Sequence, residues 1–206
     1  MLKIWGRPNS INVQKAMWAI GELELEHEHT PAGGQFGLND QDWYLRMNPN
    51  GRVPVIDDDG FILYESNVIV RYLAAKHGRG TLQPDGLKEN ALANQWMDWQ
   101  QTTLSPAMFA PFWGLIRTPP EQRDHEAIRK GGEDCARLFK QLDAWLEGRT
   151  FMIGSRLTTA DIPVGAATYR WFNLDIPHPE VPNVQAWYER LQERPAYRRH
   201  VMLPIT

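Results

Sequence analysis

The chain has 206 residues, a formal net charge of −3 and 42% hydrophobic residues, which together describe a folded globule of one large or two small domains. The nearly balanced charge and the lack of a long basic run argue against a nucleic-acid partner. No stretch approaches the roughly 20 apolar residues that cross a bilayer, so we expect no membrane partner.

The sequence contains a single cysteine, Cys135, within a helical pattern. One cysteine excludes an internal disulfide and a cysteine-rich metal site, and the histidines show no ligand spacing, so we expect no metal. The chain opens on a strand pattern instead of the apolar core of a signal peptide, which predicts a cytoplasmic location. Four arginines near the C-terminus are interpreted as the solvated face of a helix, namely Arg190, Arg194, Arg198 and Arg199.

Strand and helix patterns alternate in the first part of the chain. Apolar residues recur at helical spacing from Val13 to Leu23 and predict an amphipathic helix over residues 12–24, with Asn12 as its cap. The other predicted elements, in chain order, are a strand over 2–5, a strand over 27–30, a loop over 33–37, a short helix over 40–47 and a helix over 66–77.

The most informative segment runs from Asn48 to Ser66. A Pro-Asn-Gly turn leads into a β-branched strand that is interrupted by Pro54, which has no N–H to donate to a central ladder. A proline after valine can adopt the cis form, which bends the chain and turns backbone groups outward. Residues 57–60 predict a hairpin turn, and Ser66 is expected to cap a helix whose free N–H groups can hold an anion.

The rest of the chain shows only helical patterns, after a breaker-rich linker over residues 78–86. Helices are predicted over 87–115, 121–147, 159–172 and 183–193, with a short one after Pro195. Pro106 and Pro111 are expected to kink the first of these helices. The segment Thr158–Asp161 fits a capping box and is interpreted as structural.

The segment Asn48–His77, with Val53-Pro54 followed by Glu65-Ser66, resembles the glutathione-binding half of a cytosolic glutathione S-transferase. In that family the residue before the cis-proline pairs its backbone with the cysteinyl part of glutathione, and the acidic residue and serine hold the γ-glutamyl end. The resemblance implies α/β followed by all-α architecture: a thioredoxin-like domain over residues 1–80 and an all-helical domain over 87–206. It also implies a homodimer.

A thioredoxin-like domain commonly carries Cys-x-x-Cys at the start of its first helix, where this chain has Ser10-Ile11-Asn12-Val13. The protein therefore has to use the thiol of its co-substrate, glutathione. Lowering a thiol pKa from about 8.5 by two units needs roughly 2.7 kcal/mol. One hydrogen bond to a charged group contributes about 1.5–3 kcal/mol. Ser10 and Asn12 are the candidate donors, and helix capping is the alternative role for each.

Three classes of the family are compatible with this segment. Ser10 aligns with a threonine, and Asn12 with an asparagine, in bacterial nu-like members, whereas Ser10 aligns with a cysteine in the beta class. A theta-like alignment, with one residue gapped, also places the serine donor of that class at Ser10. The absence of tyrosine between Leu2 and Asp42 excludes the classes that use a tyrosine donor.

Further contacts are inferred from the resemblance. Arg52 and Gln35 are expected to reach the glycyl carboxylate, and Asp98 to reach the γ-glutamyl amine bound by the neighbouring subunit. A solvated surface position is the alternative for each. Phe109 and Trp113, four residues apart in a helical pattern, are expected either to line the pocket of a small hydrophobic electrophile or to lie in the core.

The resemblance implies an enzyme that activates the glutathione thiol for attack on an apolar electrophile. Glutathione-dependent disulfide reduction, which nu-like members favour, is an alternative. Isomerase or dehalogenase chemistry would use the same site, and a non-catalytic glutathione-binding protein is the remaining alternative.

Overall fold

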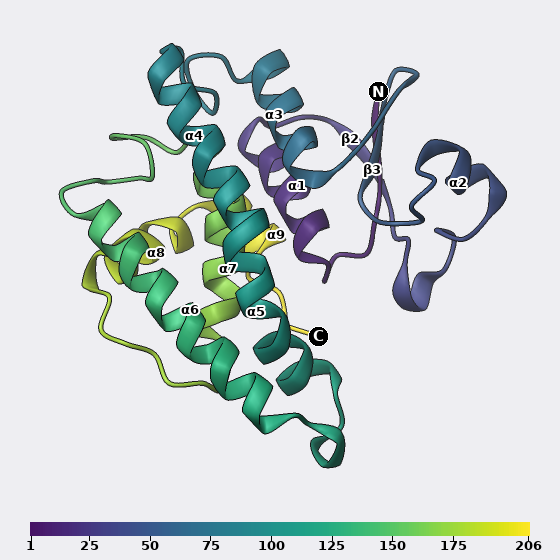
Figure 1. Ribbon diagram of the computed structural model, residues 1–206. Helices are drawn as coiled ribbons and strands as arrows, with labels where there is room; N and C mark the ends of the chain where they lie inside the picture. The colour runs from purple at the N-terminus through teal and green to yellow at the C-terminus, as the bar shows by residue number, and fades with distance from the viewer.

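The computed structural model describes all 206 residues. The chain begins with a four-stranded sheet in the order β2-β1-β3-β4, in which β1 and β2 are parallel and the other pairs are antiparallel. Figure 1 shows this sheet on one side of the molecule and a bundle of helices on the other. The strands are β1 (Leu2–Trp5), β2 (His27–Thr30), β3 (Val55–Asp58) and β4 (Phe61–Tyr64).

The strands follow from alternation and turn chemistry. Leu2 and Ile4 of β1 are buried while Lys3 between them is exposed, as expected for a strand with one face on a core. The β3–β4 hairpin turns at Asp59 and Gly60, whose φ angles are both positive (52° and 92°). Two positive φ angles are characteristic of the type I′ turn, which confirms the predicted hairpin.

The part of the chain that forms the sheet also contains three helices, which are α1 (Ile11–Glu22), α2 (Asp42–Met47) and α3 (Ser66–His77). Helices α1 and α3 pack together, and α2 lies at the outer edge of the molecule in Figure 1. Two predicted caps are wrong by one or two residues. Helix α1 begins at Ile11, so its N-cap is Ser10 instead of Asn12, and α3 begins at Ser66, so its N-cap is Glu65.

The segment from Leu87 to Arg117 forms one long helical run with two wide turns. It consists of α4 (Leu87–Trp99), a π-helical segment (Gln100–Leu104), α5 (Ser105–Phe112) and a second π-helical segment (Trp113–Arg117). Pro106 follows the first wide turn and Pro111 precedes the second. The first wide turn lies where the ring of Pro106 and its missing N–H disturb the ladder, in the turn before that residue. Pro111 lies inside α5, and the second wide turn follows it.

The remaining helices complete the bundle, and none of the helices is long and apolar enough to cross a membrane. They are α6 (His125–Leu146), α7 (Asp161–Phe172), α8 (Pro182–Gln192) and α9 (Pro195–His200), with single 3-10 turns at Gly34–Phe36 and Pro120–Gln122. Residues 78–86 between α3 and α4 hold turns and one isolated bridge, between Arg79 and Gln83.

The predicted capping box differs from the observed contacts in two respects. Helix α7 begins at Asp161 with Ala160 at its N-cap position, so Thr158 is not the N-cap residue. The carboxylate of Asp161 accepts hydrogen bonds from the backbone N–H of Thr158, as a capping box requires. The Thr158 hydroxyl, however, donates to the same carboxylate (3.0 Å) instead of accepting a helix N–H. The other carboxylate oxygen accepts from the Met152 N–H and from Trp187 Nε1, both at 2.9 Å. Asp161 therefore joins three segments of the bundle.

Helix α1 contributes to two separate cores. Trp18 and Ala19 belong to the large core of the helical bundle, whereas Met17 and Ile20 pack with the sheet. The Trp18 ring lies so close to α7 that a Cβ on Gly165 would stand 3.0 Å from it. A residue that follows α8 also contacts α1. Arg194 makes a two-point ion pair with Glu22, so the interpretation of Arg194 as a solvated residue is wrong.

Lys15 joins the sheet domain to the helical bundle from a fully buried position on α1. Its Nζ donates to Asn67 Oδ1 on α3 (3.1 Å) and to Gln100 Oε1 in the first π-helical segment (3.3 Å). Burial lowers the pKa of Lys15 to about 7, and the carboxylate of Glu65 opposes this shift. A lysine amine is ordinarily protonated at neutral pH, whereas Lys15 loses its proton near pH 7.

The low pKa of Lys15 predicts a pH-dependent stability. The unfolded chain holds the Lys15 proton up to about pH 10.4, so it binds more protons than the native state above about pH 7. The free energy of unfolding therefore gains a contribution as the pH rises from about 7 to 10, which amounts to about 3 kcal/mol. In urea denaturation, the stability of the wild type relative to Lys15→Met should increase over this range. The exposed Lys88→Met variant is the control. If the free energy of unfolding depends on pH in the same way in the wild type and in Lys15→Met, the low pKa of Lys15 is wrong.

We expect a large decrease in the free energy of unfolding when the carboxylate of Asp161 is removed. In Asp161→Ala, the buried donors of Thr158, Met152 and Trp187 lose their acceptor, and each unsatisfied buried donor costs about 1–3 kcal/mol. We expect urea denaturation to show a loss of about 3–5 kcal/mol. Asp134→Ala, on the exposed face of α6, should change the free energy of unfolding by less than about 0.5 kcal/mol. Equal effects of the two variants would show that the Asp161 network is unimportant.

Candidate active site

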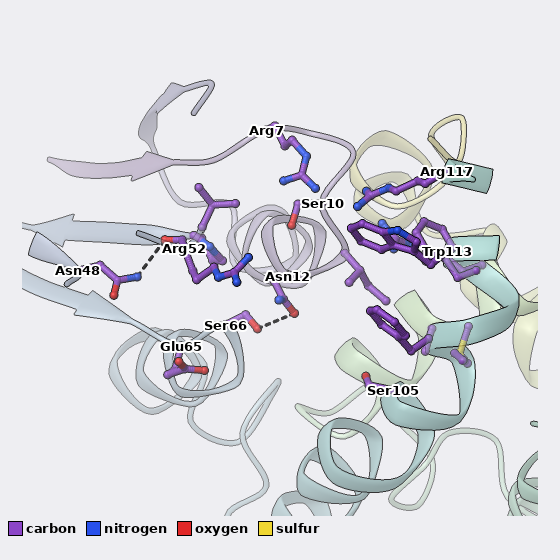
Figure 2. A pocket seen from close by; sticks show the side chains of 18 residues that line it. Arg7, Ser10, Asn12, Asn48, Arg52, Glu65, Ser66, Ser105, Trp113 and Arg117 are labelled. Atoms are coloured by element: carbon purple, nitrogen blue, oxygen red, sulfur yellow. Dashed lines mark hydrogen bonds between the residues drawn. The ribbon is translucent and has the colours of Figure 1, made fainter. Parts of the chain in front are cut away.

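A cavity of about 540 Å³ opens between the sheet domain and the helical bundle. Its walls come from the loop before α1, the loop before β3, the start of α3, and the helical run from α5 to Arg117. Figure 2 shows side chains from all of these segments turned toward a common space. Most of the residues selected from the sequence line it, namely Ser10, Asn12, Arg52, Val53, Pro54, Glu65, Ser66, Phe109 and Trp113.

The loop before β3 is held by hydrogen bonds to one carbonyl oxygen. The backbone oxygen of Arg52 accepts from the Tyr44 hydroxyl (2.8 Å) and from Asn48 Nδ2 (2.9 Å). The Val53–Pro54 peptide is cis, as predicted. Val53 lies outside the strands and makes no backbone hydrogen bond of its own, so its N–H and C=O are available to a ligand at the cavity wall.

The start of α3 forms a second wall. Its N-cap, Glu65, has a φ angle of +71°, an uncommon conformation for a residue with a side chain. No side chain caps this end of the helix, and its first turn contains no acidic residue. The N–H groups of the first turn therefore lack side-chain acceptors, and Ser66 at the first helical position lines the cavity.

The start of α1 also lacks a side-chain cap. Ser10 occupies the N-cap position and is only 8% exposed, yet its hydroxyl makes no capping hydrogen bond. The first turn of α1 contains no acidic residue either. The capping alternative for Ser10 is therefore wrong in this structure, because the hydroxyl is left free beside the N–H groups of the helix. This end of α1 can stabilise a negative charge in the cavity.

Asn12 connects the starts of α1 and α3. Its side-chain oxygen accepts a hydrogen bond from the Ser66 hydroxyl (3.2 Å, dashed in Figure 2). Because that oxygen is used as an acceptor, the Nδ2 group of Asn12 is left as a donor. Asn12 is the second residue of α1 and does not cap it.

Gln35 and Asp98 lie outside this cavity. Gln35 lines an adjoining hollow of about 610 Å³, which it shares with Arg52 and Val53. Asp98, on α4, forms an ion pair with Arg71 of α3. Within one chain this contact agrees with the helix-face interpretation of Asp98, and its contact with a neighbouring subunit stays a prediction.

The wall from the helical bundle is aromatic. Phe109 and Trp113 are stacked, with ring centroids 5.5 Å apart and an interplanar angle of 18°. They are 61% and 44% exposed, so the core alternative for this pair is wrong. Met108 and Phe112 continue the same wall. A planar apolar group can therefore lie against these rings.

Sequence reasoning missed three arginines that line the cavity: Arg7, Arg117 and Arg170. Arg7 precedes Ser10 in the loop after β1, and Arg117 follows Trp113 by four residues, so their proximity to the predicted site could have been noticed. Arg170 had no such signal, because it lies in α7, whose sequence has the pattern of a buried core helix.

The arginines carry unbalanced positive charge. Burial lowers the pKa of Arg170 to about 9, and the charges of Arg117 and Arg7 add to this effect. Burial also lowers the pKa of Arg117, with a further contribution from Arg7. No group of three or more histidine, cysteine, aspartate or glutamate side chains in the chain is arranged to hold a metal ion.

Comparisons with known proteins agree with this architecture. The family model described as the glutathione S-transferase N-terminal domain matches residues 1–75, and the model of the C-terminal domain matches residues 104–195.

Individual relatives match over all or most of the chain. Glutathione S-transferase GstB of Escherichia coli K12 is 44% identical over 208 residues, covering 100% of both chains. Glutathione S-transferase D7 of Drosophila melanogaster is 34% identical and covers 87% of this chain and 78% of its own. The crystal structure of a theta class glutathione S-transferase from Xanthomonas axonopodis pv. citri, with glutathione bound, superposes with a TM-score of 0.96. It is 43% identical and covers 100% of this chain and 99% of its own.

Both halves of the chain thus match the same family, and the cavity lies where the two halves meet. The chain belongs to the glutathione S-transferase family, and it is a glutathione-dependent enzyme.

Proposed function

We propose that the cavity between the two domains binds glutathione and that Ser10 activates its thiol for transfer to an electrophile. The observation that carries this proposal is the meeting of two uncapped helix N-termini at one cavity. Each of these helix ends favours a negative charge. Glutathione presents two such charges in this region, the γ-glutamyl carboxylate and the thiolate.

The binding roles follow from the local chemistry of each wall. The free backbone groups of Val53 pair with the cysteinyl peptide unit of glutathione. The Ser66 hydroxyl and the first N–H groups of α3 hold the γ-glutamyl carboxylate, and Glu65 holds the amine beside it. Arg52 and Gln35 meet at the adjoining hollow and take the glycyl carboxylate. This arrangement places the cysteinyl sulfur toward the start of α1.

Thiol activation requires only modest energy. A thiol pKa near 8.5 falls by two units if the thiolate gains roughly 2.7 kcal/mol relative to the thiol. The Ser10 hydroxyl, donating to the thiolate, contributes about 1.5–3 kcal/mol. The start of α1 adds about 0.3–1 kcal/mol. Asn12 Nδ2 is the alternative donor, because its oxygen is already bonded to Ser66.

The reaction is a nucleophilic substitution. The thiolate sulfur forms a bond to the electrophilic carbon, the bond from that carbon to its leaving group breaks, and the leaving group departs with the electron pair. The thiol proton is released to solvent before attack. Phe109 and Trp113 hold the electrophile by contact with its apolar surface. Such a reaction supports detoxification of small electrophiles.

The likeness to a theta class structure supports the theta-like alternative among the three classes, in which serine is the donor. We further propose a homodimer in the cytoplasm. The dimer rests on family resemblance, and Asp98 is the residue through which one subunit would reach the site of the other. The cytoplasmic location rests on the single cysteine, which suits a reducing compartment.

Ser10→Ala tests the activation of the thiol. Loss of the donor destabilises the thiolate, so we expect the pKa of bound glutathione to rise by about one unit or more. The loss in kcat/KM should approach about tenfold below pH 6 and be about fivefold near pH 6.5, and it should shrink above the new pKa, because the thiolate then forms unaided. A pH–rate profile and the ultraviolet absorbance of the thiolate measure this change.

Ser105→Ala is the matched control, because it removes a hydroxyl from the helical wall of the same cavity (Figure 2). It should leave the pKa of the bound thiol unchanged. If Ser10→Ala also leaves it unchanged and Asn12→Ala raises it, the donor is Asn12. If neither variant shifts the pKa, side-chain activation is wrong.

Glu65→Gln tests the recognition of the γ-glutamyl amine. The variant keeps the shape of the side chain but removes the charge that faces the ammonium, so glutathione should bind about tenfold more weakly. Titration calorimetry with glutathione and with its N-acetyl derivative separates this contact from general damage. The wild type should prefer glutathione, and Glu65→Gln should bind both ligands nearly equally. An unchanged preference in the variant would place the amine elsewhere.

A further inference from the structure

The part of the cavity next to the aromatic wall is strongly cationic. Arg7, Arg117 and Arg170 line it, and none of them forms an ion pair with an aspartate or a glutamate. Arg117 donates from Nε (3.4 Å) and Nη2 (3.0 Å) to the backbone oxygen of Thr206. The only acidic residue at the cavity is Glu65, which lies on the opposite side in Figure 2 from Arg7 and Arg117. Three guanidinium groups that have no aspartate or glutamate partner are costly to hold together unless an anion binds among them.

The hydrogen bonds of the three arginines leave donors unused. The Arg7 side chain makes no hydrogen bond within the chain, and Figure 2 shows its guanidinium group turned toward the space beside Ser10. Arg170 donates from Nη2 to the backbone oxygen of Asn9 (2.7 Å), but its Nε is buried without a partner. Arg170 is only 7% exposed, and it is thus a nearly buried charged side chain at the cavity wall with an unsatisfied donor.

The arginines are adjacent to the aromatic surface. The guanidinium carbon of Arg117 lies 4.7 Å from the centroid of the Trp113 ring. The guanidinium carbon of Arg170 lies 4.3 Å from the centroid of the Phe112 ring. A ligand that places a flat ring against the exposed Phe109–Trp113 pair would therefore bring a substituent of that ring within reach of the guanidinium groups.

We propose that the electrophile is an aromatic carboxylate, whose ring lies against Phe109 and Trp113 and whose carboxylate binds among Arg7, Arg117 and Arg170. This inference rests on the proposed function and narrows its second substrate from a purely apolar to an anionic electrophile. Arginine suits the role because its planar donors match the two oxygens of a carboxylate. The attacked carbon is a ring carbon that bears halide, and the halide leaves with the electron pair.

The glycyl carboxylate of glutathione is the competing occupant. Arg7 and Arg117 also line the adjoining hollow, where Gln35 and Arg52 lie. Arg170 lines the main cavity and not that hollow. The position of Arg170 favours a carboxylate on the side of the second substrate, and the two occupants predict different kinetic changes.

A pair of probes that differ in one charge tests the inference. The enzyme, saturated with glutathione, is assayed with 4-chloro-3-nitrobenzoate and with 4-chloro-3-nitrobenzamide, and each kcat/KM is divided by the uncatalysed rate with glutathione. The wild type should favour the benzoate by at least about tenfold. Binding of the unreactive 3-nitrobenzoate and 3-nitrobenzamide to the glutathione complex, measured by calorimetry, should show the same preference without turnover.

Arg117→Gln and Arg7→Gln should each reduce the preference for the benzoate by about tenfold, while kcat/KM for the benzamide and KM for glutathione change by less than about twofold. Arg137→Gln, on the exposed face of α6, removes the same charge far from the cavity and should keep the wild-type preference. The melting temperature of each variant shows whether it folds.

Two results would overturn the inference. A wild type without preference for the anionic probe in either assay would show that the arginines do not bind the electrophile. Variants that raise KM for glutathione and slow both probes equally would assign the arginines to the glycyl carboxylate. In both cases turnover of the benzamide would leave the proposed transferase function intact, whereas absence of glutathione binding would contradict that function itself.

Discussion

Helix α1 is fixed along its whole length, and the chemistry of the protein depends on this constraint. Every residue from Val13 to Ile20 is buried, because one side of the helix packs with the sheet and α3 while the other packs into the helical bundle. Arg170 holds the loop before the helix through the Asn9 carbonyl, and Arg194 holds its far end through Glu22. The start of α1 therefore cannot shift independently of either domain.

This fixation gives the cavity its electrostatic character. The N–H groups at the start of α1 and the free Ser10 hydroxyl are held in place, so the proposed formation of a thiolate there would need no reorganisation. Asn12 and Ser66 couple that place to the start of α3, where a carboxylate would bind. The domain contacts that stabilise the fold thus also determine the distance between the two uncapped helix ends.

The parts of the site that sequence analysis predicted are those with a local signature. Val53-Pro54 and Glu65-Ser66 each combine backbone constraints with neighbouring turn signals, and the hairpin between them follows from Asp59 and Gly60. The strands were predicted nearly to the residue because alternation and breakers define them. Helix starts were less certain, since serine, asparagine and glutamate near one another can all occupy the cap position.

The parts that could not be predicted depend on contacts between distant segments. The bond between Asn12 and Ser66 spans 54 residues, and the bond between Arg170 and Asn9 spans 161. Arg170 lies among apolar residues of a core helix, and nothing in that pattern shows that its side chain reaches a cavity on another domain. Lys15 is similar, because its polar partners come from α3 and from the π-helical segment after α4.

In the proposed mechanism, a fixed helix end and one hydroxyl convert a bound thiol into a thiolate. The most direct test is the pKa of the glutathione thiol in its complex with the unmodified enzyme, followed by the ultraviolet absorbance of the thiolate as the pH is varied. This mechanism requires a pKa about two units below the value of about 8.5 for a free thiol. A thiol that titrates near 8.5 when bound would rule the mechanism out, however tightly glutathione is held.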